Sequence, residues 1–523
     1  DKGNSTDNKV TVDGTATVNG NVYGGMTTVA GGKASHNEVT INEGVTLNGH
    51  GCVYGGSANS GSSADNKVYL NGIRIPGTVY GGSTGLGTAN GNEVHLNGAT
   101  VTGDVIGGNG DSTNKNKVYL LNGAQVTGTV FGGNATSAND NEVHLNGATV
   151  TGSVYGGAAN GTGNLLSVKG VNRAGKIAGF QKVSFDTAGV AAGATMLNVN
   201  GGVGTTFERD AIDATGSTVN GGITLLHNAN GITVNGLAAT DNILKSETDA
   251  TTEKNISVHK TGSNITDIRY EGYQFADVTT AVTTATEAYG GISKAGNSTH
   301  DNVITVNGAY ANVYGGHTSG AGTTRDDKDN SYRNSVTITG GTLGNVYGGY
   351  TESATGTTTG NTVNIGDGTN ALTAGTTIAE IHGGNRTAQG NKLVVNTAAT
   401  VGKVLSFEKF IFNHTASAGT TPMLTITNGA TDLDFNAIEA TDAATENPVT
   451  LVHNSAGLNL TNYDAAKVKS TLNEAGTQET NIDVRKTGAL NTDVIRYAYT
   501  FAGATAATTV GSDTWGGRSV AGN

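Results

Sequence analysis

The chain has 523 residues, including 82 glycines, only 3 prolines and 1 cysteine, and its formal net charge is -12. The acidic balance and the scattered basic residues argue against nucleic acid or an anionic membrane surface as a partner. One cysteine excludes an intrachain disulfide framework and a cysteine-based metal cluster. No apolar run approaches the length that spans a bilayer, so we expect no membrane insertion of this segment.

A four-residue motif, Val-Tyr-Gly-Gly, recurs along the chain and closes one sequence unit after another. It occupies residues 22–25, 53–56, 79–82, 154–157, 313–316 and 346–349. Variants keep the glycine pair and place Ile106, Phe131, His382 or Trp515 at the ring position. The units repeat about every 25 residues, and a fixed short period of this size indicates stacked structural repeats. At the ring position we favour a partly buried structural column over an exposed ladder that stacks sugar rings.

The start of each unit predicts a short strand with one buried face. In residues 66–72 and 92–98, valine and leucine alternate with polar residues after a leading asparagine, and an Asn-Gly turn follows. Two further short strands complete the unit, so stacked units would build three parallel sheets around a narrow core. We therefore predict an all-β fold, a right-handed parallel β-helix of about 25 residues per rung. The predicted core includes Val68, Leu70, Val94, Leu96, Val118, Val143 and Leu145.

Charges alternate at the position after the leading asparagine. Over successive units this position holds Lys9, Glu38, Lys67, Glu93, Lys117 and Glu142. If these side chains stack at the distance between neighbouring strands, each charge lies between two opposite charges. Two residues further on, tyrosine and histidine alternate as Tyr69, His95, Tyr119 and His144. Duplication of a two-rung block explains the origin of both patterns, and neither pattern makes the histidines catalytic.

A second, longer repeat predicts two tandem modules. After Leu165 the Val-Tyr-Gly-Gly pattern gives way to a less regular segment that is also rich in predicted strands. Its motifs recur 226 or 227 residues later, as 180–185 does at 407–412 and 268–270 does at 495–497. The predicted boundaries are 1–164 and 293–391 for the repeat blocks, 165–292 and 392–517 for the irregular blocks, and 518–523 for the start of a further repeat.

The two ends of the sequence are in phase with this tandem. Residues 295–299 at the module junction resemble residues 3–6 and residues 521–523. The last residues therefore resemble the opening of a third module. We expect the terminal rungs to continue into another copy, either by covalent repetition in a longer gene product or by head-to-tail stacking of chains.

Two motifs have the spacing of ligand-binding loops without their required residues. Residues 170–176 match a phosphate-binding loop, but Ile177 stands where the magnesium-binding serine or threonine belongs. Residues 326–329 cluster carboxylates without the glycine and the final glutamate of a calcium-binding loop. We interpret the first as chance and the second as part of a solvated loop, with a weak surface ion site as a minor alternative.

Some parallel β-helices act on polysaccharides, and in this chain a unique catalytic site would have to lie in the irregular blocks. The candidates are His227 with His453 and Arg269 with Arg496. Each occurs once per module beside an apolar run, and we favour a packing or capping role over catalysis. The sequence therefore predicts no catalytic, cofactor-binding or metal-binding residue.

The recurring Val-Tyr-Gly-Gly units, in a chain rich in glycine, asparagine and threonine, resemble the passenger region of a Gram-negative autotransporter. The resemblance covers both repeat blocks. It implies a right-handed β-helix, an extracellular position at the bacterial cell surface, near absence of cysteine, and roles in adhesion, aggregation or biofilm. On these grounds covalent repetition is the favoured explanation of the matching ends.

We expect a non-enzymatic, rod-like surface adhesin or structural fibre. Its expected partners are host or bacterial surface glycans or proteins, or copies of itself through end-to-end stacking. Long loops such as residues 320–333 are the expected contact points. One alternative is a self-assembling head-to-tail extracellular filament, and a second is a polysaccharide-acting β-helix enzyme.

Overall fold

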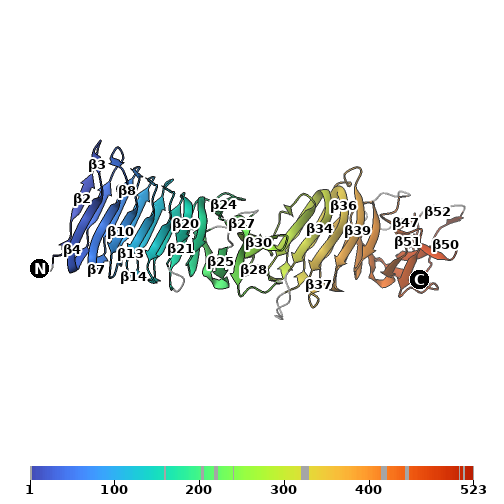
Figure 1. Ribbon diagram of the computed structural model, residues 1–523. Helices are drawn as coiled ribbons and strands as arrows, with labels where there is room; N and C mark the ends of the chain where they lie inside the picture. Colours follow the sequence, from blue (N-terminus) through green and yellow to red (C-terminus); the bar gives the residue numbers. More distant parts are fainter. Residues whose placement is uncertain are drawn as a thin grey trace. The chain divides into compact units, whose positions relative to one another are not determined.

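The computed structural model describes residues 3–157, 161–201, 205–216, 222–239, 241–319, 329–413, 421–441, 447–505, 507–510 and 513–521. It divides into two compact units. The first comprises Asp1–Glu247 and Lys254–Gly272, and the second comprises Thr248–Glu253 and Tyr273–Asn523. Each unit contains a β-solenoid, in which short parallel strands stack coil upon coil (Figure 1). The predicted all-β fold with stacked parallel coils is confirmed.

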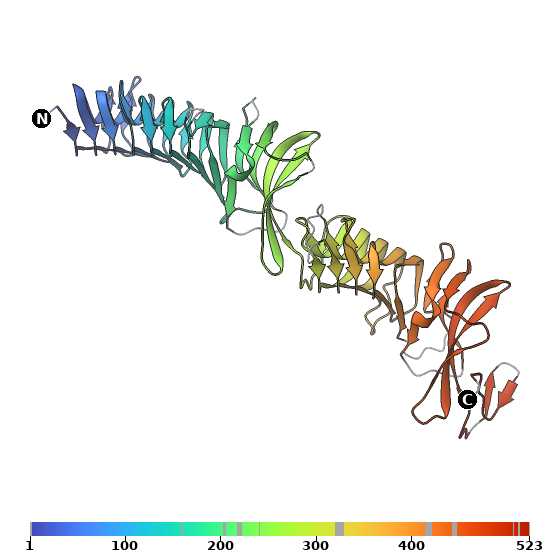
Figure 2. The ribbon, with the colours of Figure 1, turned by 90° about the horizontal axis from the view of Figure 1, so that it is seen from below.

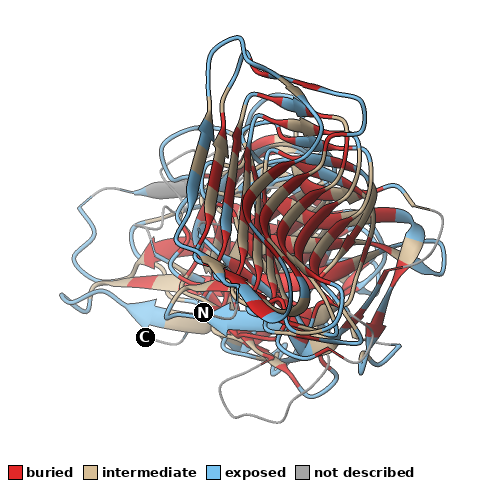
Figure 3. Cartoon of the chain, turned by 60° about the vertical axis from the view of Figure 1, so that its left-hand side comes forward, coloured by how far each residue is buried: buried red, intermediate tan, exposed pale blue. Residues whose placement is uncertain are grey.

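One sheet of the first unit is formed by the strands that follow the leading asparagines. Its nine strands are β2 (Lys9–Val12), β5 (Glu38–Ile41), β8 (Lys67–Asn71), β11 (Glu93–Asn97), β15 (Lys117–Leu121), β19 (Glu142–Asn146), β21 (Leu165–Lys169), β23 (Lys182–Asp186) and β26 (Ile212–Thr215). Alternate residues along these strands are buried, and Figure 3 shows buried positions as red bands that recur from coil to coil. The seven residues predicted for the core are all buried to at least 99%. The predicted strand register is therefore confirmed.

The alternating charges form one external column, as predicted. Lys67 lies opposite Glu93, Glu93 opposite Lys117, and Lys117 opposite Glu142. The Lys117 ammonium is 3.2 Å from the Glu142 carboxylate. These side chains are partly exposed, so each ion pair contributes about 1 kcal/mol or less. The column favours correct register more than it adds stability.

The Val-Tyr-Gly-Gly motifs lie in a second set of stacked strands. These are β4 (Val22–Ser35), β7 (Val53–Ala64), β10 (Val79–Thr84), β13 (Val105–Asn109), β17 (Val130–Asn134) and β20 (Thr149–Tyr155). Shorter strands lie between and beside them: β1 (Ser5–Thr6), β3 (Thr17–Asn19), β6 (Thr46–Asn48), β9 (Arg74–Ile75), β12 (Thr100–Val101), β14 (Ser112–Asn114), β16 (Gln125–Val126) and β18 (Ser137–Asn139).

The aromatic rings of the motifs stack along the solenoid. Tyr23, Tyr54 and Tyr80 follow one another with ring centroids 4.7 Å apart and nearly parallel planes. The three rings are half-buried, in agreement with the predicted partial burial. Because each ring covers the face of the next, the column presents ring edges to solvent and leaves few faces for a sugar to stack on.

A column of asparagines runs along the inside of each unit. In the first unit the side-chain amide of Asn66 donates to Asn92 Oδ1 at 2.9 Å, and that of Asn92 donates to Asn116 Oδ1 at 2.9 Å. The backbone N–H of each asparagine donates to the same oxygen. We call these columns the asparagine ladders. Their members are Asn8, Asn37, Asn66, Asn92, Asn116, Asn141 and Asn164 in the first unit, and Asn302, Asn334, Asn361 and Asn391 in the second.

The first unit ends in less regular strands that include an antiparallel pair (Figure 2). They are β22 (Asn172–Ala178), β24 (Thr195–Val199), β25 (Thr205–Glu208), β27 (Ile223–Asn235), β28 (Ile243–Thr248), β29 (Thr252–Thr261) and β30 (Asn264–Gln274), with a short 3-10 helix, η1 (Arg209–Ala211). Strands β27 and β30 run antiparallel. The sequence predicted parallel stacking here as well, and the antiparallel pair is the main departure from that prediction.

The second unit opens with its own repeat block. Its strands are β31 (Val282–Thr283), β32 (Glu287–Ser293), β33 (Thr299–His300), β34 (Val303–Thr318), β35 (Ser331–Tyr332), β36 (Ser335–Thr351), β37 (Thr357–Thr359), β38 (Thr362–Ile365), β39 (Thr377–Gly384), β40 (Thr387–Gln389) and β41 (Lys392–Val395). Strands β32, β34, β36 and β39 carry the ring positions and pair in parallel.

The remainder of the second unit repeats the irregular pattern. It contains β42 (Ala399–Leu405), β43 (Lys409–Phe412), β44 (Leu424–Ile426), β45 (Thr431–Asp434), the 3-10 helix η2 (Phe435–Ala437), β46 (Ile438–Ala440), β47 (Val449–His453), β48 (Leu458–Thr461), β49 (Lys469–Leu472), β50 (Gln478–Thr487), β51 (Leu490–Thr500), β52 (Thr508–Val510) and β53 (Asp513–Trp515). Strand β51 runs antiparallel to both β47 and β50.

Candidate functional site

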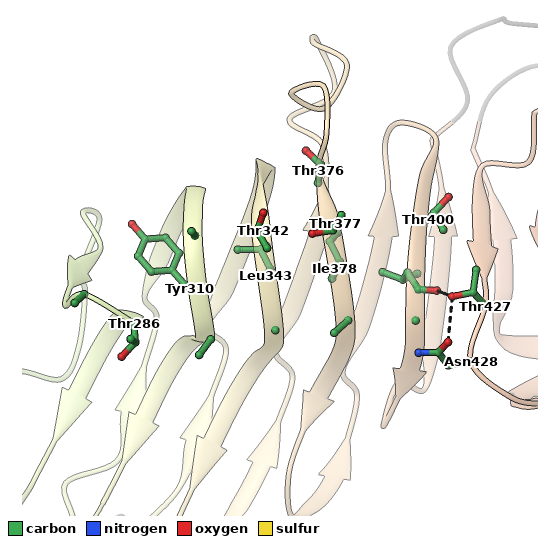
Figure 4. Close-up of a pocket in the computed structure, with 17 residues that line it drawn as sticks. Thr286, Tyr310, Thr342, Leu343, Thr376, Thr377, Ile378, Thr400, Thr427 and Asn428 are labelled. Atoms are coloured by element: carbon green, nitrogen blue, oxygen red, sulfur yellow. Dashed lines mark hydrogen bonds between the residues drawn. The ribbon is translucent and has the colours of Figure 1, made fainter.

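A shallow groove crosses successive rungs of the second unit. Its cavity volume is about 650 Å³. Figure 4 shows Thr286 and Tyr310 toward one end and Thr427 and Asn428 at the other. We call it the threonine groove; its lining is Ala285, Thr286, Ala309, Tyr310, Ala311, Thr342, Leu343, Gly344, Thr376, Thr377, Ile378, Ala379, Thr400, Val401, Gly402, Thr427 and Asn428.

The groove repeats a three-residue pattern from rung to rung. Thr342 lies opposite Thr377, and Leu343 lies opposite Ile378. Leu343, Ile378 and Val401, in the middle of the pattern, are buried. The threonine before each of them is exposed, and the small residue after it is exposed at Ala379, half-buried at Gly344 and buried at Gly402. Ile378 in turn lies opposite Val401. The exposed surface is therefore a row of threonines beside a row of alanines and glycines.

Close packing between rungs explains the glycines in this row. A Cβ at Gly344 would lie 2.2 Å from the carbonyl oxygen of Ala311, and one at Gly402 would lie 2.2 Å from that of Ala379. Only glycine lets the backbones approach so closely at these bends. The small residues keep the surface hollow where larger side chains would fill it.

The lining of the groove has hydroxyl groups and apolar surface but almost no titratable side chains. Tyr310 is its one titratable residue. At one end, the Thr427 hydroxyl donates to the carbonyl oxygen of Val401 at 3.3 Å (Figure 4). General acid–base catalysis needs paired carboxylates or a comparable acid and base. The groove lining offers hydrogen bonding and apolar contact, which are the means of binding a neutral ligand.

The two candidate histidines occupy equivalent places, one in each unit. His227 Nδ1 lies 2.7 Å from Asp267 Oδ1, and His453 Nδ1 lies 2.7 Å from Asp493 Oδ1. Each pair lies directly opposite across an antiparallel strand pair. In the first unit the Thr266 hydroxyl donates to the other oxygen of Asp267 at 2.8 Å. Because the hydroxyl meets the carboxylate and not the imidazole, the arrangement ties two strands together and does not activate a nucleophile.

The candidate arginines also lie in these antiparallel strands. Arg269 Nη1 is 3.4 Å from the carboxylate of Glu271, and Arg496 is buried opposite Val449. Glu271 also accepts the Ser257 hydroxyl at 2.7 Å and contacts His259 at 3.2 Å. Burial raises the pKa of Glu271, but the hydrogen bonds from His259 and Ser257 outweigh it and lower the pKa to about 2. The structure brings neither arginine to the threonine groove.

Comparisons with protein-family models, curated proteins and solved structures find no match.

An aromatic cluster in the second unit surrounds a buried histidine. His317 stacks on Tyr350 with ring centroids 5.1 Å apart. Its ring is tilted against that of Tyr314, with ring centroids 4.7 Å apart. Burial, together with the nearby charge of Lys294, lowers the pKa of His317 to about 4. The carboxylate of Glu352 lies 3.6 Å from the ring and is half-exposed. The charge of Glu287 raises the pKa of His317, but by less than burial lowers it.

The second unit is expected to lose stability as the pH falls from 7 to 4. An unfolded His317 takes up a proton near pH 6.5, whereas the folded state resists protonation until about pH 4. The unfolded state therefore binds more protons between pH 7 and pH 4. Over this range the free energy of unfolding falls by about 3 kcal/mol. Urea unfolding at several pH values measures it. His317→Gln should flatten this dependence, and His36→Gln, at an exposed site, should leave it unchanged; an unaltered slope in His317→Gln would contradict the assignment.

Other predicted contact points lie outside the site or outside the described residues. Residues 320–328, which include most of the predicted contact loop and 326–328 of the acidic cluster, are not among the described residues. Residues 172–178, within the motif that resembles a phosphate-binding loop, form strand β22 and no helix. In the described ranges, no group of three or more His, Cys, Asp or Glu side chains could hold a metal ion. Over the same ranges, no helix has the length and apolar character to cross a membrane.

Sequence reasoning missed the groove and two buried glutamates. Glu253 and Glu479 are fully buried and lie 226 residues apart. Their equivalent places in the tandem could have indicated them, because a carboxylate that recurs in phase with a repeat is a candidate for a fixed structural role. The groove has no comparable signal, since its surface consists of threonine, alanine and glycine, which are abundant throughout the chain.

Proposed function

We propose that this chain is a non-enzymatic extracellular adhesin of a bacterial cell surface, and that the threonine groove binds an extended glycan. The observation that carries the proposal is the continuity of the groove across successive rungs. Neighbouring rungs lie about 4.8 Å apart, so a linear polymer lying along the groove meets the same groups at each step. Stacked rungs that repeat the same surface also suit attachment, aggregation or biofilm formation.

The chemistry of the groove supports a neutral saccharide as its ligand. The threonine hydroxyls both donate and accept hydrogen bonds, as sugar hydroxyls do. The alanine and glycine row gives flat apolar surface for the C–H faces of sugar rings, and Tyr310 adds an aromatic ring at one end. A charged polymer would find no opposite charge among the lining residues.

Binding of the purified chain to a panel of neutral polysaccharides tests this proposal. Ala311→Arg combined with Ala379→Arg fills the groove, and we expect the affinity to fall by about tenfold or more. Ala398→Arg is the matched control, because Ala398 is exposed but does not line the groove. Equal binding by the groove variant would contradict the proposal. Release of saccharide that is abolished by His227→Ala would instead favour the polysaccharide-acting enzyme.

A further inference from the structure

A second cavity lies in the first unit, where β26 and β28 come together. Its volume is about 400 Å³, which is within the usual range of small-molecule sites. Its lining includes Leu165 of β21, Ser184 of β23, Ile212 of β26 and Lys245 of β28. We call it the β26 cavity. The equivalent place in the second unit shows which chemical group such a site can hold.

Lys245 in the first unit and Lys469 in the second are equivalent residues. In each unit a hairpin turn is closed four residues after the lysine by a backbone hydrogen bond, which Asp249 donates at 2.9 Å and Asn473 donates at 3.0 Å. The turn of the second unit is two residues longer. The two lysines are therefore 224 positions apart, while the residues around them keep the offset of 226.

The ammonium group of Lys469 lies on two backbone carbonyl groups. Its Nζ donates to the carbonyl oxygen of Asn436 at 2.9 Å and to that of Ile438 at 2.7 Å. Ile438 begins β46, which is the terminal strand in its part of the sheet. A carbonyl group that points off a terminal strand needs a donor from outside the sheet. In the second unit the lysine supplies that donor.

The equivalent carbonyl groups of the first unit belong to residues that line the β26 cavity. They are those of Asp210 and Ile212, 226 positions earlier. Strand β26 is also terminal in its sheet. The Thr215 carbonyl accepts the Thr187 N–H at 3.0 Å and so faces β23. Because alternate residues of a parallel strand bond to opposite sides, the Ile212 carbonyl faces away from β23, toward the open edge.

Lys245 takes different partners from those of Lys469. Its Nζ lies 2.8 Å from the Asp213 carboxylate and 3.3 Å from that of Glu247. Arg209 ties η1 to β28, since its Nη2 donates to the Ile243 carbonyl at 3.1 Å. These contacts hold β28 and its lysine in an arrangement that the second unit does not share. The two carbonyl groups are therefore left for another ammonium group.

The charges around the β26 cavity are compatible with a cationic ligand. Two of the three cations in its lining, Lys245 and Arg209, are each paired with a carboxylate. The third, Lys182, corresponds to Lys409, whose charge acts on Lys469 in the second unit. An ammonium group is held there in spite of that neighbour. Two carboxylates also line the cavity.

We propose that the β26 cavity binds the primary ammonium group of an amino sugar. The ammonium donates to the carbonyl groups of Asp210 and Ile212, as Lys469 does to their equivalents. The Ser184 hydroxyl can bond a sugar hydroxyl, and Leu165 offers apolar surface to the C–H face of the ring. The threonine groove belongs to the other unit and takes a neutral ligand, so either proposal can fail without the other.

Calorimetric titration of the purified chain with three sugars tests the proposal. Glucosamine is expected to bind at least about tenfold more tightly than glucose or N-acetylglucosamine. Glucose has no ammonium group, and acetylation removes the charge and two of the donors. Equal binding of the three sugars, or no binding of glucosamine, would overturn the proposal. Cadaverine, a diamine without a sugar ring, should bind more weakly than glucosamine; equal affinity would overturn the assignment of a sugar.

Ser184→Ile places in the first unit the residue that the second unit has at this position of its sheet, Ile411. The larger side chain fills the β26 cavity, and the affinity for glucosamine is expected to fall by about tenfold or more. Ser167→Ile is the matched control, because Ser167 lies opposite Ser184 on the neighbouring strand but does not line the cavity. Circular dichroism should show the same fold for both variants. Unchanged affinity in Ser184→Ile would contradict the proposal.

A second set of variants tests the role of the carbonyl pair. Asp213→Asn combined with Glu247→Gln releases Lys245, which can then occupy the carbonyl groups as Lys469 does, so glucosamine binding should weaken by about tenfold. Adding Lys245→Met removes this competitor and should restore binding. Binding that stays weak in the triple variant would show that the carboxylates hold the ligand, and would overturn the assignment of the carbonyl pair.

Discussion

Replacing Asn116 with alanine is expected to lower the free energy of unfolding of the first unit by about 3–5 kcal/mol. The Asn116 side chain is fully buried. Its Oδ1 accepts the backbone N–H of Asn92 at 3.0 Å and the side-chain amide of Asn92 at 2.9 Å, and its Nδ2 donates to the Ala89 carbonyl at 2.9 Å. Alanine leaves these groups unpaired in the core, at about 1–3 kcal/mol for each.

Hydrogen exchange of strands β11, β15 and β19 measures this loss locally, which is necessary because stacked repeats need not unfold in one step. Asn134→Ala is the matched control. Asn134 is exposed, and its side chain donates only to Asn109 at 3.0 Å, so its removal should change stability by about 0.5 kcal/mol or less. Equal effects of the two substitutions would show that the buried ladder does not stabilise the unit.

Replacing Gly81 with alanine is expected to destabilise the first unit by about 3 kcal/mol. A Cβ at Gly81 would lie 2.5 Å from the carbonyl oxygen of Gly107 and 3.0 Å from Asn92 Cβ. Neither neighbour can move away, because Gly107 belongs to the next rung of the sheet and Asn92 belongs to the asparagine ladder. The substitution forces two hydrogen-bonded rungs apart. Urea unfolding followed by circular dichroism measures the change.

Gly123→Ala separates this effect from ordinary glycine strain. Gly123 has a φ of +82°, and a Cβ there would meet nothing within 4 Å. Its replacement by alanine should lower the free energy of unfolding only by the strain of a left-handed backbone, about 1–2 kcal/mol. The glycine with the unusual backbone angle is therefore expected to tolerate alanine better than Gly81. The reverse order would mean that neighbouring rungs can separate easily.

The strands and their register could be predicted because the sequence encodes them twice. The alternation of Val68 and Leu70 with polar residues marks one buried face, and the signs of Lys67 and Glu93 mark which residues lie opposite. Both patterns depend only on neighbouring positions and on a constant repeat length. In the structure, β8 pairs with β11 and β11 pairs with β15 in the same register.

The asparagine ladder and the groove could not be predicted in the same way. Asparagine is common at turns, so Asn116 at the start of a unit indicated a boundary and not a buried hydrogen-bonding column. The groove depends on how closely Gly344 approaches the rung before it, which is a property of the bend and not of residue type. The bond between His227 and Asp267 joins residues 40 positions apart, across an antiparallel pair that the parallel repeat pattern did not indicate.

The alternating charge column limits how the repeat block can change length. Removing one rung between β8 and β15 would place Lys67 directly against Lys117, and every later contact in the column would still alternate. Removing two adjacent rungs would restore a lysine beside a glutamate at the new join. Like charges directly opposite one another destabilise a sheet. The length of this block should therefore change by pairs of rungs. Only the gain or loss of an even number of rungs keeps a lysine opposite a glutamate at the new join.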